Sequence, residues 1–323
     1  MALTRCYRDG SLVAEGFPVA DVSDYLSDPA NTVWFDLCTP DSAELESIRE
    51  ELGLHLLAVE DATQPGQRPK LDHYPEHMFL VAYATSIDPT TARLRSSEVT
   101  AFITEHALVT VRPDDSFDIG QVVRRWDEDA SLASGGVAFL VHGLVDYVVD
   151  SHYDTVQQMD NVVDALEDQL FNERIKDTVV QRQTFDVRKD LVAMRRLVLP
   201  MREVVNSLLR RDLGIVPPML SPYFQDVYDH VLRVSEWTDS LRDLLANILE
   251  TRLTLRGNRL NVITKQVTSW AAIIAVPTAV TGFYGQNVPY PGFGHTSGFI
   301  VSTAVILLGS GTLYAIFKSK DWL

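Results

Sequence analysis

A tripeptide near the C-terminal end carries side chains that could do chemistry at the mouth of a pore. Gly285, Gln286 and Asn287 follow an apolar run and precede a loop rich in Gly and Pro. Gly and Asn are common at the C-terminal ends of helices, so the tripeptide alone is weak evidence of function. In a ring of copies, the Asn287 carboxamides would present neutral oxygen dipoles to a passing ion. Mg²⁺ prefers oxygen ligands and sheds its water reluctantly, so such a ring could hold hydrated Mg²⁺ without trapping it.

The segments around this tripeptide are predicted to cross a membrane twice. Residues 266–317 contain no Asp, Glu, Lys or Arg. The apolar runs Val267–Tyr284 and Ser297–Phe317 are each long enough for a bilayer core, which needs about 17–25 helical residues. Basic residues lie before the first run and after the second, namely Arg252, Arg256, Arg259, Lys265, Lys318 and Lys320. Because the connecting loop has no Lys or Arg, the positive-inside rule predicts that both termini are cytoplasmic.

The composition argues against several other classes of function. A net charge of −16 is unsuited to nucleic acid, which needs a basic face to displace the counterions of its phosphates. Cys6 and Cys38 allow at most one disulfide and are expected to be reduced cytosolic thiols. There is no Walker-type loop, and no His pairs with Cys or His at metal-ligand spacing. We therefore expect neither an enzyme nor a small organic substrate.

The residues before the spans are predicted to form an acidic cytosolic region. Residues 1–135 mix β-rich runs with short helices, which indicates a sheet with helices packed against it. Residues 136–221 are typical of a helical hairpin whose first helix carries most of its acids on one side. That side is either a solvated face or a surface that collects divalent cations. The fold class expected is an α+β cytosolic domain with a long helical stalk and two transmembrane helices.

The stalk is expected to need copies of itself. Residues 222–285 contain no convincing helix stop before Pro277, which lies well inside the first span. A continuous helix over these residues would be ~95 Å long at 1.5 Å per residue. Such a helix cannot bury its apolar face alone, which suggests a symmetric oligomer around an axis. The loop 286–296, the second span 297–317 and a basic tail 318–323 complete the expected organisation.

Several motifs in a fixed order resemble the CorA-type magnesium/cobalt channel family of the CorA/ZntB superfamily. They are Val59-Glu60-Asp61, Gln67-Arg68-Pro69-Lys70, Arg202-Glu203-Val204, Tyr223-Phe224-Gln225-Asp226-Val227-Tyr228-Asp229-His230, Tyr284-Gly285-Gln286-Asn287 and Lys318-Ser319-Lys320-Asp321-Trp322-Leu323. The resemblance covers nearly the whole chain. It implies a funnel-shaped homopentamer embedded in the lipid of the cell (inner) membrane, which transports Mg²⁺ and is also regulated by Mg²⁺.

The resemblance also implies roles for individual residues. The family's Gly-Met-Asn selectivity signature maps to Gly285-Gln286-Asn287. Counting back without gaps gives five pore-lining positions, which are Glu250, Asn261, Thr264, Val267 and Ala275. The regulatory Mg²⁺ site between cytosolic domains maps to Asp61, with Glu60 beside it, facing Asp226 of a neighbouring copy. Asp146 matches a further acidic position. Low intracellular Mg²⁺ would vacate this sensor and favour opening for passive Mg²⁺ influx.

The chain also departs from the family pattern. Gln286 replaces the signature Met, and the outer loop lacks an acid. The family's apolar constriction positions map to Thr264, Val267 and Ala275, which are smaller than the Met or Leu usual in the family. Relatives with altered signatures include ZntB-type zinc transporters, so transport of Zn²⁺, Co²⁺ or Ni²⁺, with or without proton coupling, is an alternative. A membrane-anchored acidic scaffold that conducts nothing is an alternative of another class. The retained Gly-x-Asn turn and the polar Asn261 argue against the scaffold.

Overall fold

The computed structural model describes residues 3–171, 177–210, 214–286 and 288–323. The chain divides into two compact units, residues 1–246 and 247–323. The first unit contains a seven-stranded sheet with the strand order β2-β1-β3-β7-β6-β5-β4. Its strands are β1 (Leu3–Arg8), β2 (Ser11–Glu15), β3 (Asn31–Cys38), β4 (Lys70–His73), β5 (Met78–Ile87), β6 (Leu94–Ile103) and β7 (Ala107–Arg112). β3 and β7 run parallel, whereas the other neighbouring pairs are antiparallel.

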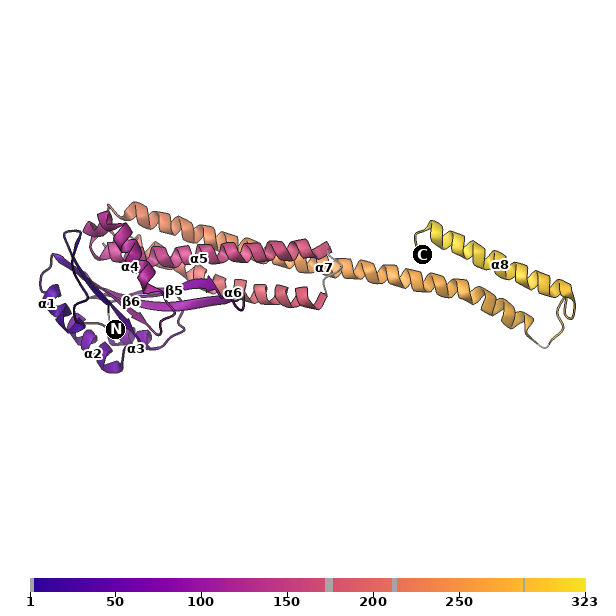
Figure 1. Ribbon diagram of the computed structural model, residues 1–323, viewed down its shortest axis with the longest axis horizontal. Coiled ribbons are helices and arrows are strands. Elements are labelled where there is room, and N and C mark those ends of the chain that lie inside the picture. The colour runs from indigo at the N-terminus through magenta and orange to yellow at the C-terminus, as the bar shows by residue number, and fades with distance from the viewer. Residues whose placement is uncertain (1–2, 172–176, 211–213, 287) are drawn as a thin grey trace. The chain divides into compact units, whose positions relative to one another are not determined.

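Helices cover both faces of this sheet (Figure 1). One face packs on α1 (Val22–Leu26), α2 (Ser42–Leu52) and α3 (Leu56–Thr63) through a core that includes Phe35 and Phe102. The other face meets α4 (Ile119–Glu128) and α5 (Val137–Asp168), where the Trp34 and Trp126 rings lie 4.8 Å apart. Because side chains alternate along a strand, Trp34 and Phe35 point to opposite faces. The expected sheet with helices against it is confirmed.

Local sequence signals explain where α2 begins and ends. The Asp41 side chain accepts hydrogen bonds from the backbone of Ala43 and Glu44, and the Glu44 side chain accepts one from the backbone N–H of Asp41. These reciprocal bonds satisfy donors that a helix N-terminus otherwise leaves free. Gly53 ends the helix in the left-handed conformation, with φ of 64°. The acidic first turn and the following Gly53 predict a helix over Asp41–Leu52, and the structure confirms it.

Three long helices follow the sheet. α5 packs against β5 and α6 (Asp177–Leu208), and α7 runs from Ser221 to Tyr284 without a break. The continuous long helix predicted from the sequence is confirmed. A count of about 100° per residue along the sequence predicts that Val162 lies on the apolar side of α5. This prediction is wrong, because Val162 is 42% exposed, whereas its neighbour Val163 is fully buried.

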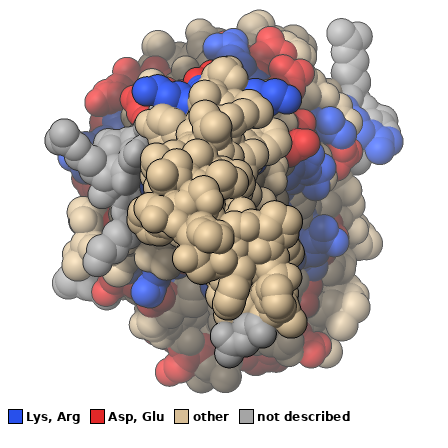
Figure 2. Space-filling model, turned by 90° about the vertical axis from the view of Figure 1, so that its right-hand side faces the viewer, with Lys and Arg blue, Asp and Glu red and all other residues tan. Residues whose placement is uncertain are grey.

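The second unit contains the C-terminal part of α7 and the helix α8 (Thr296–Ser319). By length and composition, α7 and α8 are the helices of the described chain that could cross a membrane. The uncharged surface that residues 266–317 contribute is visible as tan in Figure 2. Gly309 lies so close to α7 that a Cβ added there would meet Val276 at 3.0 Å. A small residue at this point permits close packing of the two helices.

Candidate ion path and regulatory carboxylates

The predicted selectivity tripeptide begins immediately after the last residue of α7. The Gly285 N–H donates to the Thr281 carbonyl at 2.8 Å, and the Gln286 N–H donates to the Phe283 carbonyl at 3.3 Å. The first bond spans four residues, as in the α-helix, and the second spans only three. The helical hydrogen bonding therefore continues for two residues past Tyr284, with a tighter last turn. Gln286 is exposed. Asn287, the predicted filter residue, lies outside the described residues.

An aromatic cluster holds the loop that follows. The Tyr290 hydroxyl donates to the Tyr284 carbonyl at 3.1 Å, which satisfies one of the acceptors left free at the end of α7. The Tyr290 ring also lies edge-on to Tyr284 at 5.0 Å and to Phe293 at 5.2 Å. Tyr290 therefore positions the loop against the helix end that carries the tripeptide. Sequence reasoning missed this residue, although a Tyr between two Pro residues beside a helix end was the available signal.

The five predicted pore-lining residues are all on α7 and all exposed in the single chain, namely Glu250, Asn261, Thr264, Val267 and Ala275. At about 100° per residue, four of them lie within about 60° of one another around the helix. Val267 lies about 100° from Glu250 on the same count. One face of α7 thus carries a carboxylate, a carboxamide and a hydroxyl in line, all of which can face a hydrated cation.

Asp61, the first predicted regulatory residue, already has a cation beside it. The Lys70 ammonium lies 2.5 Å from the Asp61 carboxylate and 2.7 Å from that of Asp72. Burial alone would raise the pKa of Asp61, but hydrogen bonds and the charge of Lys70 outweigh it and hold the pKa below its usual value. Its neighbour Glu60 is exposed and accepts a hydrogen bond from Gln64 at 3.3 Å.

Asp146 on α5 is also paired within the chain. The Arg125 guanidinium, from α4, bonds the Asp146 carboxylate and reaches Asp150 at 2.7 Å. Burial and the nearby charge of Asp150 raise the pKa of Asp146 in spite of this partner. The two carboxylates are four residues apart on α5, which places them on one side of the helix. The fork of the Arg125 guanidinium therefore clamps α4 to that side.

Asp226 near the start of α7 is more accessible than Asp61 and Asp146, the other predicted regulatory aspartates. Its side chain is 70% exposed, and His230 lies between it and Asp150, 3.9 Å from each carboxylate. A continuous series of side chains therefore runs from Asp146 through Arg125, Asp150 and His230 to Asp226. No sequence pattern indicated this series, since its members come from three helices.

The described residues bring Asp146 and Asp226 into one polar series but leave Asp61 elsewhere. Asp61 is on α3, against the face of the sheet opposite to α5. Within the described ranges there is no group of three His, Cys, Asp or Glu side chains placed to hold a metal ion. Carboxylate oxygens suit Mg²⁺, but a site that uses both Asp61 and Asp226 needs two copies of the chain.

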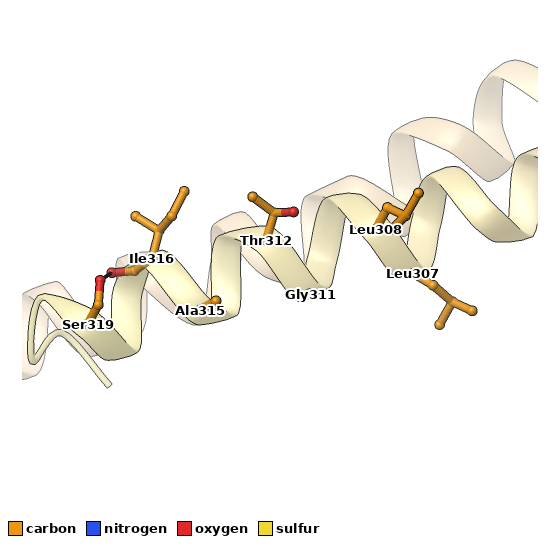
Figure 3. Close-up of a pocket in the computed structure, with 7 residues that line it drawn as sticks. All are labelled: Leu307, Leu308, Gly311, Thr312, Ala315, Ile316 and Ser319. Atoms are coloured by element: carbon orange, nitrogen blue, oxygen red, sulfur yellow. Dashed lines mark hydrogen bonds between the residues drawn. The ribbon is translucent and has the colours of Figure 1, made fainter.

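The shallow hollow on α8 has a different character. It is lined by large apolar and small residues of the helix, namely Leu307, Leu308, Gly311, Thr312, Ala315, Ile316 and Ser319. In Figure 3 the Leu307 side chain points away from those of Leu308, Thr312 and Ile316. The Ser319 hydroxyl donates to the Ile316 carbonyl at 2.9 Å, so it is satisfied within the helix. Residues 309–312, which superficially resemble a phosphate-binding loop, lie inside α8 as regular helix. The hollow therefore suits lipid or another helix.

Comparison with known proteins agrees with this architecture. The family model described as "CorA-like Mg2+ transporter protein" matches residues 29–318. The chain is 27% identical to the cobalt/magnesium transport protein CorA of Thermotoga maritima over 95% of this chain and 88% of that protein. It is 25% identical to the zinc transport protein ZntB of Enterobacter sp. over 69% of this chain and 67% of that protein.

The fold has a solved counterpart along its whole length. The complete structure of the CorA magnesium transporter from Methanocaldococcus jannaschii matches with a TM-score of 0.80 at 21% identity, covering 100% of this chain and 99% of that chain. The predicted class, an α+β domain with a long helix and two candidate transmembrane helices, is therefore confirmed. Because the family model covers most of the sequence as well, the chain belongs to the CorA-like Mg²⁺ transporter family.

Proposed function

We propose that the protein is a divalent-cation channel that carries Mg²⁺ into the cell, driven by concentration and membrane potential. The observation that carries this proposal is the single face of α7 that holds Glu250, Asn261, Thr264 and Ala275. Three of these four side chains are polar, so the proposed path can accommodate a hydrated ion. Membership of a Mg²⁺ transporter family supports the choice of ion.

The channel requires several copies in a membrane. Two spans from one chain cannot enclose a hydrated path, and the polar face of α7 is exposed when the chain is alone. We propose a homopentamer in the cell (inner) membrane with both termini in the cytoplasm, as the basic residues flanking the spans favour. The exposed apolar side chains of α7 and α8 would then face lipid and neighbouring copies.

Regulation is proposed to occur between cytosolic domains. Mg²⁺ bound by Asp61 of one copy and Asp226 of its neighbour would hold the ring closed, with Glu60 and Asp146 as further acids near the two halves. The exposure of Asp226 and its separation from Asp61 within one chain suit a site that forms only between copies. Mg²⁺ shifts the equilibrium only by as much as it binds the closed ring more tightly than the open one.

The filter assignment is tested by replacing the carboxamide. In liposomes containing the purified protein, Asn287→Ala is expected to reduce Mg²⁺ influx by about two orders of magnitude or more, since the ring of oxygen dipoles is removed. Val288→Ala, in the same loop, is the matched control and is expected to keep the wild-type influx. Unchanged Mg²⁺ influx in Asn287→Ala would show that the filter is elsewhere.

Transport of Zn²⁺, Co²⁺ or Ni²⁺ is the second candidate. Gln286 in place of the signature Met and the acid-free loop favour it, as does the likeness to a zinc transport protein. Competition between metals in the same influx assay, with and without a proton gradient, separates the two candidates. A protein that moves none of these metals but binds a partner in a metal-dependent way would instead be the scaffold considered above.

A further inference from the structure

The Lys70 ammonium occupies a ready-made cation site at the edge of the sheet. It lies 2.5 Å from the Asp61 carboxylate and 2.7 Å from the Asp72 carboxylate. It also lies 5.6 Å from the centre of the Phe79 ring, a distance at which the ring attracts a cation. Lys70 begins β4, and Asp72 is two residues along the same strand. Since i and i+2 side chains share one face of a strand, β4 presents the two charges together.

This arrangement bears directly on how Asp61 can bind Mg²⁺. An ammonium group donates hydrogen bonds but offers no oxygen to a metal. Mg²⁺ needs the same carboxylate oxygens, and two cations a few ångströms apart repel each other. Mg²⁺ can therefore coordinate Asp61 fully only when the ammonium moves away. Lys70 is 30% exposed, and its long flexible stem allows that movement.

We propose that Lys70 is a tethered competitor of Mg²⁺ at Asp61 and thereby sets the intracellular Mg²⁺ concentration at which the channel closes. This rests on the proposed function, in which Mg²⁺ at Asp61 and a neighbour's Asp226 holds the ring closed. The ammonium stabilises the metal-free sensor by balancing the Asp61 charge. Mg²⁺ must exceed a threshold before it replaces this internal cation.

Asp72 affects how strongly Lys70 competes with Mg²⁺ for Asp61. When Mg²⁺ displaces the ammonium from Asp61, Lys70 keeps its ion pair with Asp72. The displacement therefore costs less free energy than the loss of both ion pairs would. Asp72 is 40% exposed and is not among the carboxylates of the proposed Mg²⁺ site. Loss of Lys70 and loss of Asp72 should consequently move the threshold in opposite directions.

Arg125, the cation beside Asp146, differs from Lys70 in how firmly it is held. Arg125 bonds Asp146 and Asp150 together and donates through both terminal nitrogens of its guanidinium group. It also lies 5.7 Å from the centre of the Tyr147 ring. A guanidinium that forks over two carboxylates is held more firmly than an ammonium. Lys70 is thus the exchangeable cation of the proposed sensor, and Arg125 is a fixed one.

The test is the Mg²⁺ dependence of the full-length protein in liposomes, with Mg²⁺ fixed on the cytoplasmic face. Lys70→Gln is expected to lower the half-inhibitory Mg²⁺ concentration by about two- to fivefold, the range that a half-exposed ion pair allows. Asp72→Asn is expected to raise it by a similar factor. The same shifts should appear in the Mg²⁺ concentration that protects the purified protein from limited proteolysis.

A matched control removes an equivalent charge elsewhere. Arg49→Gln deletes a cation on α2 whose ion pairs are with Glu46 and Glu50, so the threshold should stay at the wild-type value. Asp226→Lys is the positive control, because it places a cation at the opposite half of the site and should make influx less sensitive to cytoplasmic Mg²⁺. Thermal unfolding of each variant shows whether it is folded.

The outcomes separate this inference from the proposed function. Absence of Mg²⁺ influx in the wild-type protein would overturn the proposed function. Normal influx with an unchanged threshold in both Lys70→Gln and Asp72→Asn would overturn the role of Lys70 and leave the channel intact. A shift of the same sign in both variants would also overturn it, since altered folding moves both thresholds the same way. A general effect of net charge would instead move them in opposite directions, so an equal shift in Arg49→Gln, which removes a positive charge away from the site, would overturn the role of Lys70 as well.

Discussion

In residues 1–246, buried charged groups find their partners inside the chain, whereas in residues 247–323 the polar side chains at the predicted pore-lining positions of α7 are exposed. Asp36 is fully buried and bonds Arg112, whose side chain is 8% exposed. Asn261 and Thr264, by contrast, are exposed on their helix. The difference separates two uses of polar groups. The first unit uses them to fix its own fold, whereas in the proposed function the second unit would use them to line an ion path enclosed by several copies.

The largest effect is expected from breaking the buried pair of the first unit. Asp36→Asn leaves the Arg112 guanidinium buried without its counter-charge, which costs about 3–5 kcal/mol of unfolding free energy. The loss is deepened because the Asp36 carboxylate also accepts a hydrogen bond from Thr110 at 2.8 Å. Chemical denaturation followed by fluorescence of the core residues Trp34 and Trp126 measures this.

Asp115→Asn is the control for that measurement. Asp115 lies 3.7 Å from the same guanidinium, but its side chain is 94% exposed. An exposed ion pair contributes little, so this variant should unfold within about 0.5 kcal/mol of the wild type. If Asp36→Asn were as stable as Asp115→Asn, burial would not determine how much an ion pair of the first unit contributes to stability. The comparison with the second unit would then fail.

A buried histidine of the same unit gives a pH-dependent effect of intermediate size. His152 is 1% exposed and its Nε2–H donates to the Tyr83 carbonyl at 2.8 Å, while Nδ1 is buried without a partner. Burial lowers the pKa of His152 to about 4. The unfolded chain, with an ordinary histidine pKa of about 6.5, therefore binds this proton more readily. Stability is complete above about pH 6.5 and is lost as the pH falls towards about 4.

The measurement compares His152→Gln with the wild type. Gln can keep a hydrogen bond to the Tyr83 carbonyl but has no proton to gain in this range. Between pH 7 and pH 4, the wild type should lose up to about 3 kcal/mol more unfolding free energy than the variant. His73→Gln, at an exposed position, should keep the wild-type slope. An identical slope in His152→Gln would mean that the buried imidazole does not titrate with folding.

Local patterns in the sequence predicted the elements of this fold but not its ion pairs. The caps of α2 and the unbroken apolar and helical pattern of α7 are set by residues a few positions apart, so they could be predicted. Asp36 and Arg112 meet only because β3 and β7 pair in parallel. Such a pairing brings distant segments together by tertiary packing, which no periodicity records.

The same limit applies to the proposed regulatory acids. Family motifs located Asp61 and Asp226, and Asp146 matched a further acidic position. The cations beside Asp61 and Asp146 come from other elements, Lys70 from β4 and Arg125 from α4. Lys70 was even part of one of the family motifs, but nothing in the sequence paired it with Asp61. The exposed residues of α7 are the reverse case. The family resemblance located these positions along α7, whereas the partners that the proposed homopentamer would give them lie in other copies of the chain.

The smallest of these effects is expected in the second unit and should appear in transport alone. Asn261→Leu replaces a carboxamide with an apolar side chain on the polar face of α7, which should reduce Mg²⁺ influx on the order of tenfold by raising the barrier to a hydrated ion. Asn258→Leu is the matched control, because Asn258 lies about 90° from the centre of that face. The influx assay in liposomes compares the two.

Both Asn positions are exposed, so both variants should unfold at the wild-type denaturant concentration. This is what distinguishes the second unit from the first, where Asp36→Asn is expected to change folding directly. Equal loss of influx in Asn258→Leu and Asn261→Leu would show that α7 does not present one face to the ion. Lost stability in Asn261→Leu would show that this side chain serves the fold, as the buried charges of residues 1–246 do, and the contrast between the units would no longer hold.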